Sequence, residues 1–486
     1  MPVKLLDANA PKQTSGASAI TFTICRYVTY VFAVLRGVLV AKYLGPHLLG
    51  IIGFLILIMQ YLSYSGLGLH FALNVELATA PVPTHRRSSS VALTLTGIIS
   101  AGLIVLGLVI QSAHLRLFAK YSFSQYALVV GVISALTLVQ QVYTNIYRIY
   151  GKLLEIAVVE IFSALLLLLL TFVFRGQALI TALLCGLVVS SAFAIVVYTL
   201  RAPVAFSLSL ESAYVRPLLR LGIPLLIYNA SLYLITMVAQ SVVSIFYPLE
   251  AMGYYSLASS IANAALLGFN TIAWIAYPIV LGKTHHGAPD KDAARVTDRV
   301  NIILGTGVFL TVFVVVLGLP ILFLVLPNYT HARGAVTVLL LSQALLMSSF
   351  GYNCLAIARH KQMAIARVSM FCVLVVAILA IIAGITHVGF IWVAIAVLAG
   401  SALFSLFQAR IGSELLGGIK LRQIVPVGSI ASVAVCLAGT LLEHPFTGAV
   451  LGSAVYLATN TSRILEVWNI CSPFIISSSK RTISEL

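Results

Sequence analysis

Two arginines lie inside the first apolar segment of the sequence, residues 18–41. A charge near the middle of a bilayer costs about 2.5–3.5 kcal/mol on insertion scales, so such residues usually face protein or a watery cavity. In a helix Arg26 and Arg36 would lie ~15 Å apart along the axis and about 80° apart around it, on one broad face at two depths. A guanidinium stays protonated and offers a fork of donors, which suits a phosphate-like anion. Snorkelling of both side chains to the membrane surface is the alternative.

Acidic residues are scarce within the apolar segments, and Glu160 lies about two turns into the segment 153–174. A carboxyl group in such a place is a candidate for binding a coupling proton or sodium ion, or for pairing with an arginine of the first segment. Pairing with Lys152 or Arg148 near the membrane surface is the simpler interpretation.

Polar and aromatic side chains are enriched in two later apolar segments, 221–246 and 253–281. Amide and hydroxyl groups above aromatic faces can bind sugars, whereas hydrogen bonds between membrane helices, worth ~0.6 kcal/mol each, explain the same residues equally well. The residues concerned are Tyr228, Asn229, Tyr233, Gln240, Asn263 and Asn270.

The segments that must position these residues are transmembrane helices. The chain of 486 residues is 60% hydrophobic and only 9% charged, against about 25% charged in soluble domains. Many apolar blocks reach the ~20 residues that cross a bilayer as a helix, and the alternation of a membrane β-barrel is missing. The sequence predicts an all-α polytopic membrane protein with about 14 transmembrane helices, with 12 as the alternative because the last two are short. The predicted spans are 18–41, 48–71, 89–111, 124–147, 153–174, 178–200, 221–246, 253–281, 300–326, 334–358, 364–386, 389–411, 425–442 and 446–466.

The basic residues predict the orientation of these spans. The net charge of +16 comes from Lys and Arg residues between the apolar blocks, which favours topology signals over nucleic-acid binding. Apart from Arg26 and Arg36, all but five of the 29 basic residues fall on one side of the predicted layout, so both termini are predicted to be cytoplasmic. The five on the other side are Lys42, Arg116, Lys120, Arg175 and Arg333.

An internal repeat relates residues 35–58 to residues 237–261. Each copy is a helix, a short outer turn containing proline, and a returning helix that opens near a glycine, Gly50 or Gly253. Six spans separate the copies, so they share one orientation, as in transporters whose halves are related by an axis along the membrane normal. The repeat predicts an N-lobe at 1–200, a C-lobe at 201–411, and two further helices with a tail at 412–486.

Enzymatic, metal and cofactor chemistry have little support in the sequence. The six cysteines are scattered without a CxxC pair, and the histidines have no helical metal-ligand spacing. No segment between the spans is long enough for a catalytic domain. We therefore predict neither a cofactor nor a metal, and we do not expect an enzyme; a membrane-bound sugar polymerase or glycosyltransferase is the enzyme class considered.

Four stretches resemble Wzx-type oligosaccharide flippases of the MATE-like (MOP) superfamily. KYLGPHLLGIIGF (42–54) and YSGLGLHFALNVELA (64–78) resemble the family's first hairpin, with its LGP turn and following Gly-rich helix end. Two later stretches resemble the corresponding sequence in the family's second half. They are RPLLRLGIPLLIYNASLYLI (216–235) and EAMGYYSLASSIANAALLGFNTIAWIAYP (250–278). The 14-span layout extends the resemblance over essentially the whole chain.

The resemblance implies two lobes around a central cavity that opens alternately to the two leaflets. It implies transport of an undecaprenyl-pyrophosphate-linked oligosaccharide, an O-antigen or exopolysaccharide repeat unit, across the bacterial inner membrane to the periplasmic face. Arg26 and Arg36 would then bind the pyrophosphate. Membrane lipids, a proton or sodium ion, and a polysaccharide polymerase with its co-polymerase are the candidate partners.

Two points separate this chain from parts of that superfamily. Members often carry an acid in the seventh helix, where this chain has Gln240, which weakens any coupling scheme that depends on such an acid. A small-molecule or drug cation antiporter of the same superfamily is the alternative function, but organic cations favour acidic linings, and Arg26 and Arg36 favour an anion.

Overall fold

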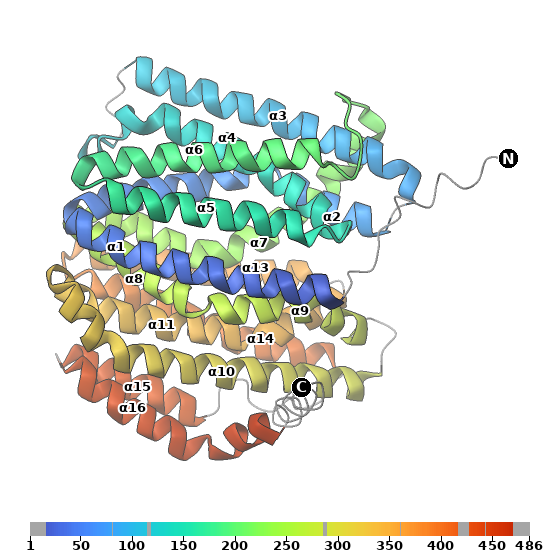
Figure 1. Ribbon diagram of the computed structural model, residues 1–486. Coiled ribbons are helices and arrows are strands. Elements are labelled where there is room, and N and C mark those ends of the chain that lie inside the picture. Colours follow the sequence, from blue (N-terminus) through green and yellow to red (C-terminus); the bar gives the residue numbers. More distant parts are fainter. Residues whose placement is uncertain are drawn as a thin grey trace, which may run out of the picture. The chain divides into compact units, whose positions relative to one another are not determined.

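The computed structural model describes residues 16–79, 81–113, 118–284, 289–359, 361–416, 427–442 and 444–469. Over these ranges the regular structure is helical and contains no strand (Figure 1). The helices are α1 (Gly16–Ser63), α2 (Leu69–Thr79), α3 (Val82–Ser112), α4 (Phe123–Ile149), α5 (Leu153–Val173), α6 (Gly176–Leu200), α7 (Ser212–Phe246), α8 (Leu249–Ala265), α9 (Leu267–Thr284), α10 (Asp290–Val325), α11 (Arg333–Ser348), α12 (Phe350–Ala358), α13 (Gln362–Ile385), α14 (Ile391–Leu415), α15 (Val427–Leu441) and α16 (Pro445–Thr459). Short 3₁₀ helices cover Tyr64–Gly66 (η2), Ala119–Tyr121 (η3) and Pro327–Ala332 (η4).

The chain is a multi-pass membrane protein. Ten helical stretches in the described part of the chain are long and apolar enough to cross a bilayer, and the bent pair α8–α9 adds an eleventh. The first stretch of 46 residues is twice the length of one crossing and contains a break at Gly45, so it counts as two spans. With the shorter apolar helices α15 and α16, the described residues accommodate the fourteen predicted spans.

The break in α1 is the turn predicted from the sequence. Gly45 has φ 68° and ψ 173°, a left-handed conformation that only glycine adopts readily, and it is the non-helical residue inside α1. Pro46 follows as the first residue of the returning helix, where its fixed φ and missing N–H are tolerated. The result is a helical hairpin that returns across the membrane.

Three predicted spans differ in detail from the structure. The span 48–71 extended too far, because α1 ends at Ser63 and the chain continues through η2 into the separate helix α2. The span 253–281 is broken, with a 46° bend between α8 and α9. The span 334–358 is also interrupted, because α11 and α12 are separated at Ser349. Apolar composition locates a crossing but does not register such breaks.

The chain forms two compact units. The first comprises residues 1–233 and 247–256, and within it α3 packs on α4 and α5 packs on α1 and α6. The second comprises residues 234–246 and 257–486, and within it α11 and α13 pack on α14, and α15 packs on α16. Figure 1 shows α15 next to α16 at the C-terminal end of the described chain. The division into lobes at 1–200, 201–411 and 412–486 stays a prediction.

The turn segment of the second repeat hairpin, residues 247–256, belongs to the first unit and contacts the first hairpin reciprocally there. A methyl group added at Gly50 would overlap the backbone oxygen of Leu249, and one added at Gly253 would overlap the backbone oxygen of Pro46. Each partner pair, Gly50 with Gly253 and Pro46 with Leu249, is separated by the same 203 positions in the sequence. This exchange of equivalent contacts is what a local two-fold relation between the hairpins produces.

Basic residues of the predicted outer loops hold both hairpin turns in the first unit. The Arg175 guanidinium lies 3.6 Å from the centroid of the Tyr43 ring, at the end of the first helix. The Lys120 amine donates a hydrogen bond to the Tyr247 carbonyl, at the turn before α8. Burial lowers the pKa of Lys120, and the nearby charge of Glu250 acts in the opposite direction. The sequence analysis interprets Arg175 and Lys120 only as topology signals, whereas in the structure they also contact Tyr43 and Tyr247.

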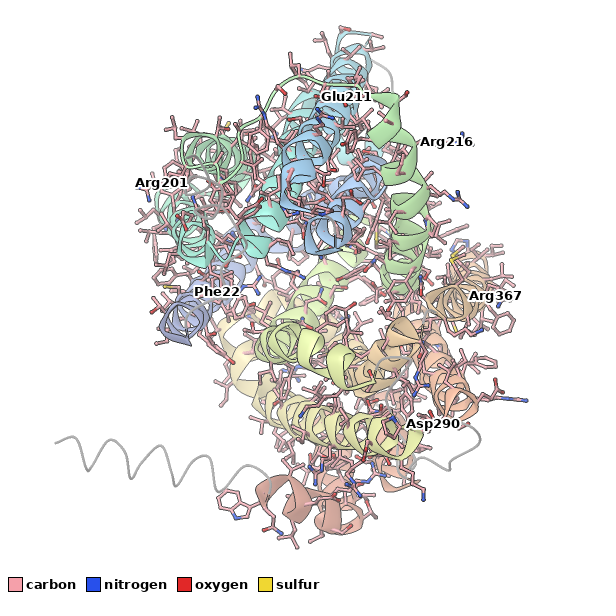
Figure 2. All side chains as sticks on the ribbon, turned by 90° about the vertical axis from the view of Figure 1, so that its right-hand side faces the viewer. Phe22, Arg201, Glu211, Arg216, Asp290 and Arg367 are labelled. Atoms are coloured by element: carbon pink, nitrogen blue, oxygen red, sulfur yellow. The ribbon has the colours of Figure 1, made fainter. Side chains whose placement is uncertain are left out.

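Figure 2 looks onto one end of the helices and labels Arg201, Glu211 and Arg216 of the first unit, which are spread across that view. The sequence places both arginines among the cytoplasmic basic residues, so the view is consistent with one charged end for that unit. Several other predicted topology residues lie outside the described residues, among them Lys4, Lys12, Arg116, Lys480 and Arg481.

Candidate functional site

The first helix and α5 bring Arg26 and Glu160 together. Arg26 Nε lies 3.4 Å from Glu160 Oε2, and the terminal nitrogen Nη2 lies 3.5 Å from Oε1, so the guanidinium faces both carboxylate oxygens. The side chains are 24% and 27% exposed, and the Arg26 guanidinium also lies 5.2 Å from the centroid of the Phe22 ring. These distances are longer than the roughly 2.7–2.9 Å of strong charge-assisted hydrogen bonds, so the pair is a loose two-point contact.

The pairing follows from the packing of α1 on α5. Glu160 lies two turns into α5, which begins at Leu153, and this depth matches that of Arg26 in α1. The simpler interpretation of Glu160, pairing with Lys152 or Arg148, is not the arrangement found. Lys152 instead donates a hydrogen bond of 3.0 Å to the carbonyl oxygen of Arg201. The acid's function as a coupling residue stays a prediction.

Arg36 lies in the same uninterrupted helical stretch as Arg26, which runs to Leu44 before the break at Gly45. The two side chains therefore lie ~15 Å apart along the helix axis, as the sequence predicts. Arg36 is half-buried, and among the described residues no hydrogen bond or ion pair to it is found. The site thus contains one arginine held by a carboxylate and one arginine whose charge is not balanced by a described acid.

Three of the predicted sugar contacts belong to the first compact unit, on α7. Tyr228 is buried, and Tyr233 is 61% exposed. The Asn229 side-chain amide donates a hydrogen bond of 2.8 Å to the Leu225 carbonyl of its own helix. Asn229 therefore still has its side-chain oxygen for another partner, and its function as a sugar contact stays a prediction.

The other three belong to the second unit. Gln240 is half-buried in α7, and Asn270 is exposed on α9. Asn263 on α8 accepts a hydrogen bond of 3.2 Å from the side-chain amide of Gln343 on α11. This contact is a hydrogen bond between membrane helices, which is the alternative to sugar binding for Asn263. Gln343 was missed in the sequence, although an amide inside an apolar span is itself a signal for such a contact.

The described residues contain no group of three or more His, Cys, Asp or Glu side chains that could hold a metal ion. In the first unit, Arg26, Arg36 and Glu160 supply two guanidinium groups and one carboxylate. Such a set can bind an anion.

Residues 15–285 match the family described as "Polysaccharide biosynthesis protein". No curated protein sequence matches the chain. Among solved structures, an inward-facing multidrug resistance MATE family transporter of the MOP superfamily is similar at 15% identity and a TM-score of 0.64, covering 82% of this chain and 99% of that one. The lipid II flippase MurJ, in an inward closed conformation, is similar at 16% identity and a TM-score of 0.62, covering 94% of this chain and 100% of that one. At these identities the likeness shows a shared MOP transporter fold.

Proposed function

Because the chain belongs to the polysaccharide biosynthesis protein family, we propose that it is a flippase for a lipid-linked oligosaccharide. The cargo is an undecaprenyl-pyrophosphate-linked repeat unit, moved from the cytoplasmic to the periplasmic leaflet of a bacterial inner membrane by alternating access. The observation that carries the proposal is the pair of arginines in the first helix, because the charge of Arg36 is not balanced by a described acid and Arg26 has a partner that a phosphate can displace.

A pyrophosphate carries at least two negative charges and needs compensation when it leaves the headgroup region. Guanidinium groups provide charge and paired donors at once. With Arg26 nearer the cytoplasmic end and Arg36 about 15 Å further along the helix, the anion can pass from one to the other. The neutral residues of α7 in the first unit, Tyr228, Asn229 and Tyr233, supply contacts to the sugars.

Glu160 supplies a means of coupling in this proposal. While it is ionised, it occupies Arg26 and competes with the cargo phosphate. Binding of a proton or a sodium ion to the carboxylate weakens its hold on the guanidinium and makes Arg26 available. Cargo binding and ion binding then favour each other, as reciprocal linkage requires.

Alternating access requires the hairpin contacts to change. We propose that the outer ends of the two hairpins, in contact through Gly50 and Gly253, separate when the lobes open to the periplasm. Close backbone approach at glycines gives tight packing without long side chains that must be withdrawn, which suits a contact that forms and breaks repeatedly.

The proposed orientation places both termini in the cytoplasm, in accordance with the charge bias. A polysaccharide polymerase and its co-polymerase are the proposed partners on the periplasmic side, where the repeat unit is delivered. We propose no enzymatic activity, since the named relatives are a transporter and a flippase.

The test is complementation of a strain that lacks its oligosaccharide flippase. We expect Arg36→Ala and Arg26→Ala, at expression matched to wild type, to reduce polymer export at least about tenfold, since a charge-assisted contact contributes about 1.5–3 kcal/mol. The matched control is Gly37→Ala on the same helix, because a methyl group there meets nothing within 4 Å. Full export by both arginine variants would refute the proposal.

A small-molecule cation antiporter is the second candidate, favoured by the likeness to MATE transporter structures. It predicts that the chain confers resistance to organic cations and that Glu160→Gln abolishes it, because that acid would bind the cation. The flippase proposal predicts no such resistance and a loss of polymer export on changing the arginines.

A further inference from the structure

A groove on the second unit lies between α13 and α14 and includes none of the residues assigned above. It has a volume of about 440 Å³ and is lined by Ala364, Arg367, Val368, Phe371, Phe407 and Ile411. Apart from the guanidinium, every lining side chain is apolar. This composition suits a hydrocarbon chain with an anionic group at its end.

The shape of the groove has a cause in the packing of the two helices. Gly400 on α14 lets the backbone approach Val376 and Cys372 of α13, so the helices lie close together at that level. Towards the start of α13 the rings of Phe371 and Phe407 meet edge to face, with centroids 5.9 Å apart. Both rings and the small Ala364 line the groove.

Arg367 gives the groove its polar end. Its side chain is exposed and, within the described ranges, makes no ion pair. Figure 2 shows it at the edge of the second unit. The other exposed arginine near this end of α14 is Arg410, which pairs with Glu414 at 3.3 Å. An anion at this end therefore meets an unbalanced charge at Arg367 and a balanced one at Arg410.

The predicted topology sets the depth of the groove. Arg367 belongs to the cytoplasmic basic residues, so it lies at the headgroup level of the cytoplasmic leaflet, which is the anionic one. From Ala364 to Phe371 the groove follows about two turns of α13, roughly 10 Å, which is well within the ~15 Å depth of one leaflet. That length fits the upper part of one acyl chain.

We propose that this groove binds an anionic glycerophospholipid of the cytoplasmic leaflet, with its phosphate on Arg367 and one acyl chain along Phe371 and Phe407. The short groove and its exposed polar end favour such a lipid over the far longer polyprenyl chain of the cargo. The site is independent of the proposed transport site, because it uses none of the residues assigned to cargo or coupling.

The test measures the lipid retained by the purified full-length protein, using native mass spectrometry in detergent with added phosphatidylglycerol, phosphatidylcholine or polyprenyl phosphate. We expect wild type to retain phosphatidylglycerol preferentially and Arg367→Gln to retain about fivefold less, as for one basic residue at a membrane surface. Arg410→Gln, the matched control, should behave as wild type. Ala364→Phe, which fills the groove and keeps the arginine, should also lose the lipid.

Three results would overturn the proposal. Equal retention by wild type and Arg367→Gln would mean that the arginine does not hold the headgroup. Equal retention of phosphatidylcholine and phosphatidylglycerol by wild type would mean ordinary boundary lipid only. Displacement of phosphatidylglycerol by equimolar polyprenyl phosphate would make the carrier lipid the occupant. None of these results bears on whether the chain transports an oligosaccharide.

Discussion

The two repeat hairpins are alike where they touch and different where they carry charge. Gly50 and Gly253 make equivalent backbone contacts, and the same offset of 203 positions pairs Gly53 with Ser256, which also meet. Applied to the preceding helices, that offset places Asn229 opposite Arg26 and Ala239 opposite Arg36. At these two positions the first hairpin is therefore cationic and the second is neutral.

The difference indicates which part of each hairpin is constrained by packing and which by chemistry. Two backbones that approach this closely tolerate no added side chain on either partner, so both copies keep small residues. A single anionic group binds at one place at a time, so both copies need not carry the charge. The four predictions below test this division, from the largest expected effect to the smallest.

The largest effect is expected from adding a methyl group at the hairpin contact. Gly50→Ala and Gly253→Ala should each cost about 3 kcal/mol of stability, because the new carbon overlaps a backbone oxygen and forces the helices apart. The measurement is the thermal unfolding midpoint of the purified protein, with Gly37→Ala as the control. The double variant should cost less than the sum, since one separation relieves both overlaps. Strict additivity would show that the two glycines do not share a contact.

The second effect is on cargo binding. Arg36→Ala makes the first hairpin resemble the second at this position, and it should lower affinity for a short-chain prenyl pyrophosphate about thirtyfold, or about 2 kcal/mol. Arg36→Lys should retain part of the affinity, because it keeps the charge and loses the paired donors. Affinity is measured by titration calorimetry. An Ala variant that binds as tightly as wild type would remove Arg36 from the site.

The third effect is the interaction between Arg26 and Glu160. A double-mutant cycle with Arg26→Gln and Glu160→Gln should give a coupling energy of about 1 kcal/mol, in keeping with the partial exposure of both groups and the 3.4 Å contact. Glu155→Gln on the same helix serves as the control and should show no coupling to Arg26. Equal coupling of both acids would mean that the effect is only long-range electrostatics.

The smallest effect is expected at the turn of the second hairpin. Lys120→Gln removes the charged donor to the Tyr247 carbonyl and should change the free energy of unfolding by about 0.5 kcal/mol. Burial lowers the pKa of Lys120 below its ordinary 10.5, so the folded state releases this proton first as the pH rises. The stability of wild type relative to the variant should therefore increase with pH below 10.5. A difference that falls over this range would contradict the direction of the shift.

The sequence predicted the helices well because membrane insertion depends on each segment's own hydrophobicity. It located the turn at Gly45, the repeat glycines and the two interior arginines, which each stand out against an apolar background. It missed the separate helix α2 and the interruptions after α8 and α11, because breaks inside an apolar segment leave its mean hydropathy unchanged. It also missed Gln343 and the groove around Arg367, which depend on what lies opposite each residue.

The sequence by itself determined that the chain crosses the membrane many times, the predicted orientation and the presence of two charges in the first helix. Those properties are sums over short stretches of chain, and water and lipid act on each stretch separately. Only the tertiary structure decided that Glu160, 134 residues away, faces Arg26, and that Gly50 meets Leu249. Such contacts depend on how each helix is rotated about its axis, and packing against neighbouring helices sets that rotation.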